Sequence, residues 1–311
     1  MNETIIDWMK APVKEYTNFV KESPKVSVCV QTYQHANFIK NCLDGILMQK
    51  TEFSFEILLG EDASTDGTRD ICIEYSDKYP DKIRLFLHNR ENVIYVNGNP
   101  TGRFNFLYNL FQSRGKYIAL CEGDDYWTDP CKLQKQVDFL EANPEYGLVS
   151  GDVDLIDENG DPLPDNQMVL KQREKRKPTV DFFDLLETNL INTLTVCTRA
   201  ELIKPLAERV VNENLWFVYD YWFWLNIALK SKIRIFDEKM AAYRVHKGGV
   251  SRKSNFFKVK KALIHHFILY EAFKHKHLNK QLFLKKYLLL LYRLIRARNI
   301  EAFAHILKLR N

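Results

Sequence analysis

Hydrophobic and polar residues follow one another along the chain in short blocks, and the block spacing predicts alternating strands and helices. Residues 26–32 (VSVCVQT) are apolar and β-branched, which predicts a buried strand. The apolar positions then recur at helical spacing from residue 38 to 47, and residues 55–60 (FEILLG) predict a second strand. This alternation is typical of βαβ units, so we expect an α/β fold with a mainly parallel sheet.

The same pattern continues through the next hundred residues. It predicts a helix over 68–79, a strand over 83–87, a loop over 89–102, a helix over 103–113, strands over 116–121 and 147–153, and between them a helix that opens at Asp129-Pro130. A polar, basic loop then runs to Pro178. Beyond it the pattern is less regular and predicts helices near 180–188, 200–210 and 219–230, with strands near 193–198 and 232–236.

Composition narrows the class of protein. The chain is 46% hydrophobic and 27% charged, as in globular proteins, and its longest apolar run (287–292) is far shorter than the roughly 18 residues of a membrane span. Charged residues interrupt the first 25 positions, so we expect no signal peptide. The six cysteines form no CxxC pair, which indicates reduced thiols and a cytoplasmic protein.

Charge marks one boundary in the chain, near Ser251. Residues 252–311 carry 15 of the 45 Lys and Arg but two of the 40 Asp and Glu, so we expect a basic helical tail there, after an N-terminal extension (1–24) and one α/β domain (25–251). Residues 284–296 predict an amphipathic helix with Lys285 and Lys286 on its polar side. Residues 255–311 therefore suit the anionic inner face of a membrane; alternatively the apolar face packs on the domain. No nucleic-acid-binding motif accompanies the charge, so we expect no nucleic-acid partner.

Three predicted strands end in polar residues. The first ends in Thr32-Tyr33, the second in Glu61-Asp62 and the fourth in Glu122-Gly123-Asp124-Asp125. Ligands of open α/β sheets bind at the carboxyl ends of strands, so we expect these side chains on one rim.

Carboxylates that gather without basic partners usually hold a cation. Oxygen ligands suit Mg²⁺ or Mn²⁺, and Mg²⁺ commonly shares its ligand sphere with substrate phosphates. The alternative for Asp124-Asp125 is a loop that caps a helix. Asp62, beside an aromatic ring, is placed to accept the N3–H of uracil, or else it forms a turn.

The segments that carry these residues resemble glycosyltransferase family 2, inverting enzymes with the nucleotide-sugar-binding GT-A fold. The matching strings are VSVCVQTYQHANFIKNCLDGIL, EILLGEDASTDGTRDI and GKYIALCEGDDYWTDPCKLQKQVDFL, with weaker matches at YDYWFWLNIAL and YRVHKGGVS. Together they span residues 25–251, and a C-terminal helical extension would follow. The Q-x-x-R-W string of processive polysaccharide synthases is absent, which favours transfer of a single sugar.

The resemblance also implies roles for individual residues. Thr32 and Tyr33, with the Glu61-Asp62 pair, would line the nucleotide site. Glu122-Gly123-Asp124 stands in place of the family's DxD motif. Asp124 would then be the direct metal ligand, with Glu122 beside it, and Asp125 would bind the donor sugar or brace the loop.

The catalytic base and the acceptor site are expected nearer the C-terminus. Asp220 lies among the aromatic residues of 216–222, where its pKa should be raised as a base requires, and the resemblance places the catalytic Asp here; alternatively it caps a helix. Tyr221 and Trp222 offer rings to an acceptor sugar. His246, in a basic Gly-containing loop, is a candidate metal ligand or a structural histidine.

We therefore expect a cytoplasmic, Mn²⁺- or Mg²⁺-dependent inverting glycosyltransferase, either free or held at the inner face of the cell membrane by its basic tail. Its donor would be a nucleotide-diphosphate sugar, with UDP favoured, and its acceptor a surface glycan or lipid-linked oligosaccharide. Two alternatives stay open. One is a nucleotidyltransferase acting on a sugar phosphate, which normally needs a Gly-rich basic loop after the first strand. The other is a non-catalytic module that binds glycans or nucleotide sugars.

Overall fold

The computed structural model describes residues 8–96, 98–216 and 220–248, together with residues 268, 269, 281, 284, 285, 287 and 288. Most of the predicted tail (252–311) lies outside these residues, so its amphipathic helix stays a prediction. In the part of the chain that is described, no helix is both long enough and apolar enough to cross a bilayer.

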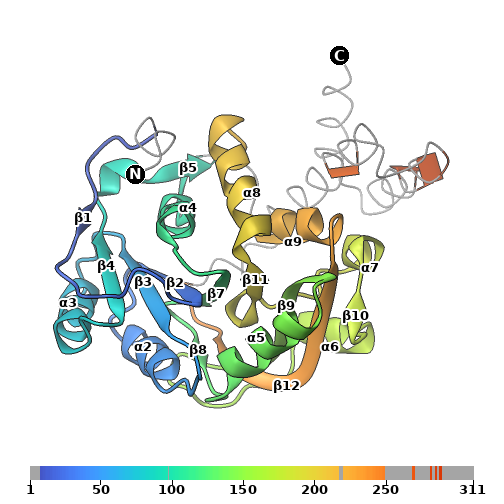
Figure 1. The fold of residues 1–311 in the computed structure, drawn as a ribbon, viewed down its shortest axis with the longest axis horizontal. Helices are drawn as coiled ribbons and strands as arrows, with labels where there is room; N and C mark the ends of the chain where they lie inside the picture. The colour runs from blue at the N-terminus through green and yellow to red at the C-terminus, as the bar shows by residue number, and fades with distance from the viewer. Residues whose placement is uncertain are drawn as a thin grey trace.

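Ten strands of the described residues form one mixed sheet, in the order β1-β4-β3-β2-β7-β11-β9-β12-β10, with β8 paired to β12 (Figure 1). β2 (Val26–Thr32), β3 (Phe55–Glu61), β4 (Ile83–Leu87) and β7 (Tyr117–Glu122) run parallel, as do β9 (Tyr146–Ile156) and β12 (Lys232–Arg244). The antiparallel strands are β1 (Lys14–Glu15), β8 (Tyr126–Trp127), β10 (Thr179–Val180) and β11 (Cys197–Arg199). The predicted α/β fold with a mainly parallel sheet is confirmed.

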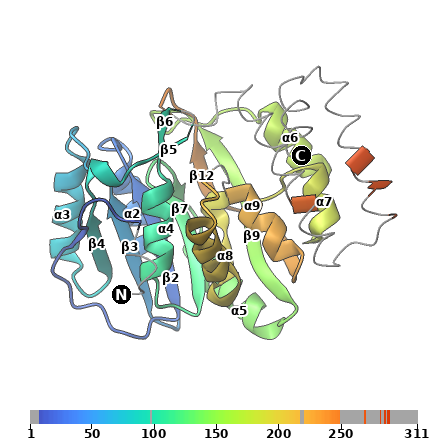
Figure 2. The ribbon, with the colours of Figure 1, turned by 90° about the horizontal axis from the view of Figure 1, so that it is seen from above.

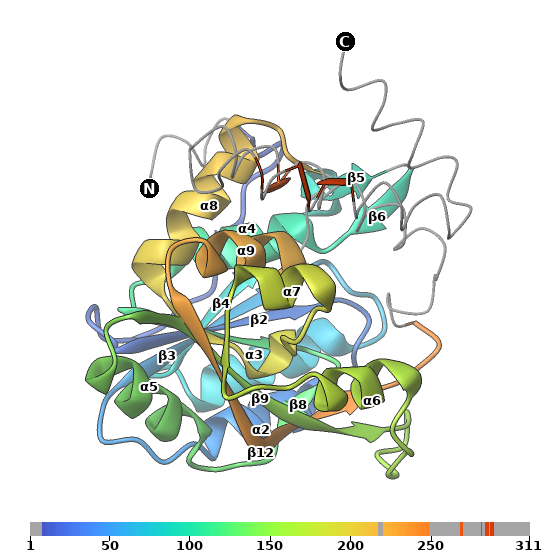
Figure 3. The same cartoon turned by 90° about the vertical axis from the view of Figure 1, so that its right-hand side faces the viewer.

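Helices cover both faces of this sheet (Figure 3). α2 (Ile39–Leu47), α3 (Thr68–Lys78) and α5 (Lys132–Ala142) pack on one face. α4 (Arg103–Gln112), α8 (Ala200–Asn212) and α9 (Asp220–Ala228) lie side by side on the other (Figure 2), next to α7 (Phe182–Glu187). Burial on both sides explains why β2 and β3 are almost continuously apolar rather than alternating.

The chain order of the parallel strands reverses between β2 and β7. From β2 the chain proceeds outward through β3 and β4, and it then returns to pair β7 with the opposite edge of β2. Open α/β sheets bind ligands outside the carboxyl ends of the strands at such a switch point. The rim that the sequence predicted, at the ends of β2, β3 and β7, is this place.

Several elements differ from the sequence prediction. β1 was not expected, and its Glu15 reaches the buried guanidinium of Arg84 on β4. The predicted loop 89–102 contains a 3₁₀ turn (η1, Arg90–Asn92) and a hairpin of β5 (Ile94–Val96) and β6 (Asn99–Thr101), and the loop before Pro178 contains α6 (Gln167–Glu174). The predicted strand 193–198 is a 3₁₀ turn (η2, Thr193–Thr195) followed by β11.

The largest difference is the length of β12. The sequence predicted a strand at 232–236, but pairing with β9 continues to Arg244 after register shifts between Ile235 and Ala241. The polar residues 237–239 of this stretch are exposed, which hid the strand from a hydrophobicity pattern. β12 therefore carries the chain from α9 to the rim and delivers His246 there.

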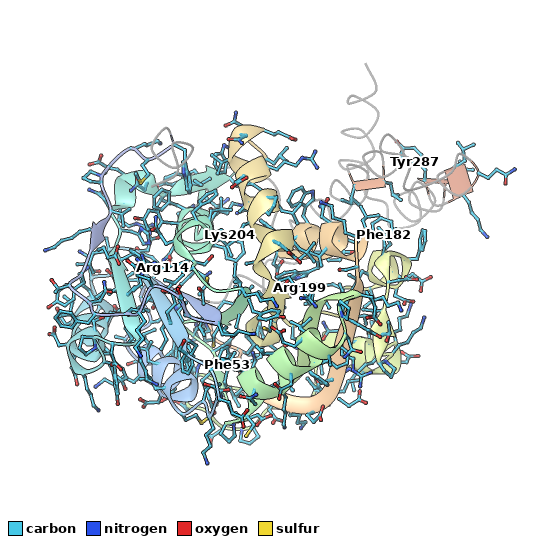
Figure 4. All side chains as sticks on the ribbon, in the orientation of Figure 1. Phe53, Arg114, Phe182, Arg199, Lys204 and Tyr287 are labelled. Atoms are coloured by element: carbon cyan, nitrogen blue, oxygen red, sulfur yellow. The ribbon has the colours of Figure 1, made fainter. Side chains whose placement is uncertain are left out.

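Two basic side chains, Arg199 and Lys204, hydrogen-bond helices to neighbouring elements (Figure 4). Arg199, at the end of β11, donates to the carbonyl oxygens of Leu140 on α5 (2.6 Å) and Tyr146 on β9 (2.9 Å). Lys204 on α8 donates to the carbonyl of Ser113, just beyond α4 (2.9 Å). These contacts fix α5 relative to β11 and β9, and α8 relative to α4.

Candidate active site

The ends of β2, β3 and β7 meet as the sequence predicted. The backbone N–H of Asp62 donates to the carbonyl of Thr32 (3.1 Å), and that of Gly123 donates to the carbonyl of Gln31 (2.9 Å). A Cβ at Gly123 would lie 2.8 Å from the Cβ of Thr32 and 2.9 Å from the Gln31 oxygen, closer than side-chain atoms approach. Glycine is therefore required for the loop after β7 to lie against β2.

Asp124 and His246 are brought together at this rim from positions 122 residues apart. The Nε2 atom of His246 lies 3.0 Å from Oδ2 of Asp124, and Nε2 of His35 lies 4.0 Å from the same oxygen. Burial acts to raise the pKa of Asp124, but the hydrogen bond with His246 and the attraction of His35 outweigh it and hold this pKa below its usual value. His35 was not predicted, although it follows Thr32 in the same loop.

Glu122 is the last residue of β7 and is half-buried. Its Oε2 is shielded from solvent and has no hydrogen-bond partner among the described residues. Burial, and then repulsion from Asp124 and Asp220, raise the pKa of Glu122 to about 8. The predicted ligands Asp124, Glu122 and His246 do not form a three-ligand group, and within the described ranges no three His, Cys, Asp or Glu side chains do. Asp124 and His246 form a pair.

Asp125 joins the loop after β7 to the end of β12. Its Oδ1 accepts the backbone N–H of Arg244 (2.7 Å), and the guanidinium of Arg244 donates to the carbonyl of Asp124 (2.9 Å). Arg244 also lies over the ring of Phe38, 4.7 Å from its centroid. Burial, followed by Asp124 and Glu122, raises the pKa of Asp125 well above its usual value. Of the two roles expected for Asp125, these contacts favour bracing the loop.

Tyr33, Asp62 and Arg90 form a second part of the site. Tyr33 is 42% exposed, and the guanidinium carbon of Arg90 lies 4.1 Å from its ring centroid. Arg90 donates to Oδ2 of Asp62 (2.6 Å), whereas the buried Oδ1 of Asp62 has no partner among the described residues. Burial raises the pKa of Asp62 to about 6, against the opposing effect of Arg90. Arg90 comes from η1, inside a predicted loop, and no pattern in the sequence pointed to it.

Both carboxylate oxygens of Glu61 are bound by other groups of the protein. One carboxylate oxygen accepts the backbone N–H of Ser64 (2.6 Å), and the other pairs with Arg69. The backbone N–H of Gln34 donates to Oγ of Ser64 (2.9 Å), so the loops after β2 and β3 are tied together. The sequence grouped Glu61 with the nucleotide-binding residues, but its contacts show a side chain that shapes the loop carrying Asp62.

Asp220 is the first described residue of α9, and both of its carboxylate oxygens are engaged. Oδ1 accepts the backbone N–H of Tyr221 (2.7 Å), and Oδ2 accepts the hydroxyl of Thr193 on η2. Burial raises the pKa of Asp220, while Thr193, the Tyr221 N–H and the positive charge of Arg103 act in the opposite direction. The pKa of Asp220 is therefore raised, as expected from the sequence.

The aromatic residues after Asp220 do not reach the site. Tyr221 is 1% exposed and donates its hydroxyl to the carbonyl of Leu185 on α7 (2.6 Å), and Trp222 is fully buried beside Phe223. The sequence predicted that Tyr221 and Trp222 contact the acceptor. This is corrected by the structure, because α9 packs against α7 and α8 and buries both rings in the core.

The fold is that of GT-A glycosyltransferases, and comparison with known proteins identifies the family. The family model for glycosyl transferase family 2 matches residues 27–204, so the chain belongs to this family. An uncharacterized protein of Mycobacterium tuberculosis is 35% identical over 225 residues, which are 72% of this chain and 60% of that protein. An uncharacterized glycosyltransferase of Methanocaldococcus jannaschii is 30% identical over 227 residues, 72% of each chain. The chain thus spans about 60% of the length of the mycobacterial relatives.

Solved structures agree on the fold. TarS of S. aureus, crystallised with UDP-GlcNAc, superposes with a TM-score of 0.56 at 18% identity, covering 79% of this chain and 66% of that one. The mannosyltransferase PcManGT of Pyrobaculum calidifontis, in complex with GDP-Man and Mn²⁺, gives a TM-score of 0.52 at 18% identity and covers 98% of this chain and 84% of its own. The predicted family and fold are confirmed.

Proposed function

We propose that this protein transfers a single sugar from a nucleotide-diphosphate sugar to an acceptor hydroxyl, with inversion at the anomeric carbon and with Asp220 as the base. One observation carries the proposal: Asp124 pairs with His246 at the end of β7, and Asp220 accepts a hydrogen bond from Thr193 of η2, which packs on the same strand. A pair of ligands for a cation and a base for an acceptor hydroxyl are therefore both held beside β7.

The donor base is assigned to the Tyr33, Asp62 and Arg90 group. An aromatic face stacks on a base, and the free Oδ1 of Asp62 is available for an N–H of that base. Uracil offers such an N–H at N3, which favours a UDP-sugar. TarS, which shares the fold, was crystallised with UDP-GlcNAc. PcManGT, however, holds GDP-Man, so guanine is the alternative that a binding screen has to compare.

A divalent cation is assigned to Asp124 and His246. A carboxylate oxygen and an imidazole nitrogen 3.0 Å apart are close enough to bind one ion, and this mixed donor pair suits Mn²⁺ better than Mg²⁺. When bound, the ion would supply positive charge to the departing diphosphate. Asp125 and Arg244 hold the loop that carries Asp124, and so they position this ligand.

The transfer itself needs a proton acceptor on the far side of the donor sugar. The acceptor oxygen forms a bond to the anomeric carbon while the bond from that carbon to the diphosphate oxygen breaks, and the hydroxyl proton passes to the Asp220 carboxylate. The raised pKa of Asp220 makes its carboxylate a stronger base than an exposed aspartate. A surface glycan or lipid-linked oligosaccharide is the acceptor that we propose, reached at an anionic membrane surface through the basic tail.

Asp220→Asn tests the function. We expect the rate of transfer to fall by about 10²- to 10⁴-fold. Thermal stabilisation by UDP and GDP sugars with Mn²⁺ should stay unchanged, because Asp220 does not hold the donor. Where no acceptor is known, release of nucleotide from each donor with water as acceptor is the assay.

Asp181→Asn is the matched control. Asp181 caps α7 by accepting the backbone N–H groups of Phe183 and Asp184, and Asn caps as well as Asp does. If Asp220 merely started a helix, the two variants would behave alike. Near-normal turnover by Asp220→Asn would reject the proposed base, and a chain that binds donors without turning them over would be the non-catalytic module.

A further inference from the structure

The second half of the string EGDDYWTDPCKLQKQ is not used by the proposed chemistry, yet three of its side chains are buried. Trp127 is 1% exposed, and Lys132 and Gln136 are fully buried. Lys132 donates to Oε1 of Gln136 (2.8 Å), and its ammonium lies 3.9 Å from the ring centroid of Trp127. A buried lysine is costly, so this arrangement needs a reason beyond packing.

Two of these residues bond directly to η2, and the third acts through one of them. The Nε1 atom of Trp127 donates to the carbonyl of Leu194 (2.7 Å), and Nε2 of Gln136 donates to the carbonyl of Thr195 (2.7 Å). Lys132 fixes the orientation of Gln136 because its ammonium takes the amide oxygen. The N–H of the Gln136 amide must therefore point at η2.

β9 holds η2 from the other side. The backbone N–H of Gly151 donates to Oγ1 of Thr195 (2.9 Å), and Nδ2 of Asn192 donates to the carbonyl of Gly151 (3.0 Å). The 3₁₀ turn is thus fixed by hydrogen bonds from three elements: β8, α5 and β9. The remaining hydroxyl of the turn, on Thr193, donates to Oδ2 of Asp220.

We propose that Thr193 is a positioning residue for Asp220, and that Trp127, Lys132 and Gln136 form a brace whose task is to hold Thr193 in place. The inference rests on the proposed function in taking Asp220 as the base. It gives the buried half of the string a role: the segment after β7 supplies the cation ligand at one end and, through η2, orients the base at the other.

The hydroxyl of Thr193 affects both geometry and charge. As a donor to Oδ2 it fixes the plane of the carboxylate, and it stabilises the ionised form that accepts a proton. The charged groups that act on Asp220 are Arg103 on α4, which also favours the ionised form, and Glu122 on β7. Loss of the hydroxyl should leave both of these in place.

Thr193→Val keeps the shape of the side chain and removes its donor. We expect the pKa of Asp220 to rise by about one unit, since one unit corresponds to about 1.4 kcal/mol and a hydrogen bond to a charged group is of that size. On the acidic limb of the pH profile, kcat should therefore fall about tenfold, with the KM for the donor unchanged.

The pKa is read directly from ¹³C NMR of the protein labelled at aspartate, with the Asp220 signal assigned by its absence in Asp220→Asn. This readout needs no substrate. Thr193→Ser, which keeps the hydroxyl, should restore the wild-type titration, and Thr193→Ala should repeat the shift if the valine variant fails to fold. Thr198→Val is the matched control, because Thr198 is a buried threonine that donates to the carbonyl of Gly147 instead.

Gln136→Met tests the brace. It removes the donor to Thr195 and should shift the Asp220 titration in the same direction, whereas Gln134→Met on the same helix should not. An unchanged Asp220 titration in Thr193→Val would overturn the inference even if Asp220→Asn is inactive. A shifted titration together with an active Asp220→Asn would instead keep the Thr193 contact and reject the proposed base.

Discussion

Arg90 stacks on Tyr33 and at the same time holds Asp62. Its guanidinium carbon lies 4.1 Å from the ring centroid of Tyr33, and its Nη1 lies 2.6 Å from Oδ2 of Asp62. One cation therefore lies against both groups that we assign to the donor base. The three side chains come from three different loops, so the group exists only in the folded chain.

Binding of UDP should depend on pH through Asp62. The ionised carboxylate accepts an N–H more strongly than the protonated group does. The pKa of Asp62 is raised to about 6, so affinity should weaken as the pH falls through about 6. Arg90→Gln removes a charge that lowers this pKa, so the loss of affinity should begin at a higher pH. Calorimetry with UDP between pH 5 and 8 measures this, and Asp62→Asn should show no such dependence. Curves for wild type and Arg90→Gln that coincide would contradict the assignment.

Mn²⁺ binding should require Asp124 and His246. Asp124→Asn removes a charged ligand and His246→Gln removes the imidazole, and each should weaken Mn²⁺ binding in the presence of UDP by about 10- to 100-fold. The free Mn²⁺ signal in electron paramagnetic resonance reports this without any turnover. Asp138→Asn, at an exposed position of α5, is the control. Unweakened binding in both variants would place the ion elsewhere.

Lys132 should make stability depend on pH in an unusual window. Burial lowers the pKa of Lys132 to about 8, below the 10.5 of an unfolded lysine, so charging it is penalised in the folded state. That penalty is complete below pH 8 and fades as the pH rises to 10.5, where the unfolded lysine also loses its proton. Relative to Lys132→Met, the wild type should gain up to roughly 3 kcal/mol of unfolding free energy across this window.

Chemical denaturation at several pH values measures the Lys132 effect. Lys135→Met is the matched control on the same helix, because Lys135 is exposed, pairs with Asp129 and has a raised pKa. The unfolding free energy of Lys135→Met relative to wild type should stay constant between pH 8 and 10.5. If the difference between Lys132→Met and wild type were also independent of pH, the Lys132 ammonium would not be buried in solution.

The tail should bind anionic membranes. Leu284 and Leu288 are 46% and 62% exposed, and Lys285 between them is exposed too. Each basic residue near an anionic surface contributes about 1 kcal/mol, so Lys285→Glu with Lys286→Glu should weaken co-sedimentation with phosphatidylserine vesicles at least about tenfold. Lys50→Glu with Lys78→Glu makes the same charge change elsewhere. Equal sedimentation of both double variants would reject membrane docking through the tail.

The parts of the fold that the sequence predicted well are those whose burial is uniform. β2, β3 and β7 are covered on both faces, so hydrophobicity alone marks them, and the rim follows from where each strand ends. β12 and α6 were missed in whole or in part because exposed polar residues interrupt their patterns. In these elements, contacts with residues distant in the chain stabilise a strand or helix that the local sequence does not predict.

By itself the sequence determined the family, the α/β architecture and the acidic residues of the rim, because these depend on strings of neighbouring residues. Only the tertiary structure decided which of them meet: Asp124 with His246, Asp62 with Arg90, and Asp220 with Thr193. It also showed that Tyr221 and Trp222 are buried in the core and that Glu61 pairs with Arg69. Contacts between residues far apart in the chain are set by packing of whole elements, and no local pattern of residue types encodes them.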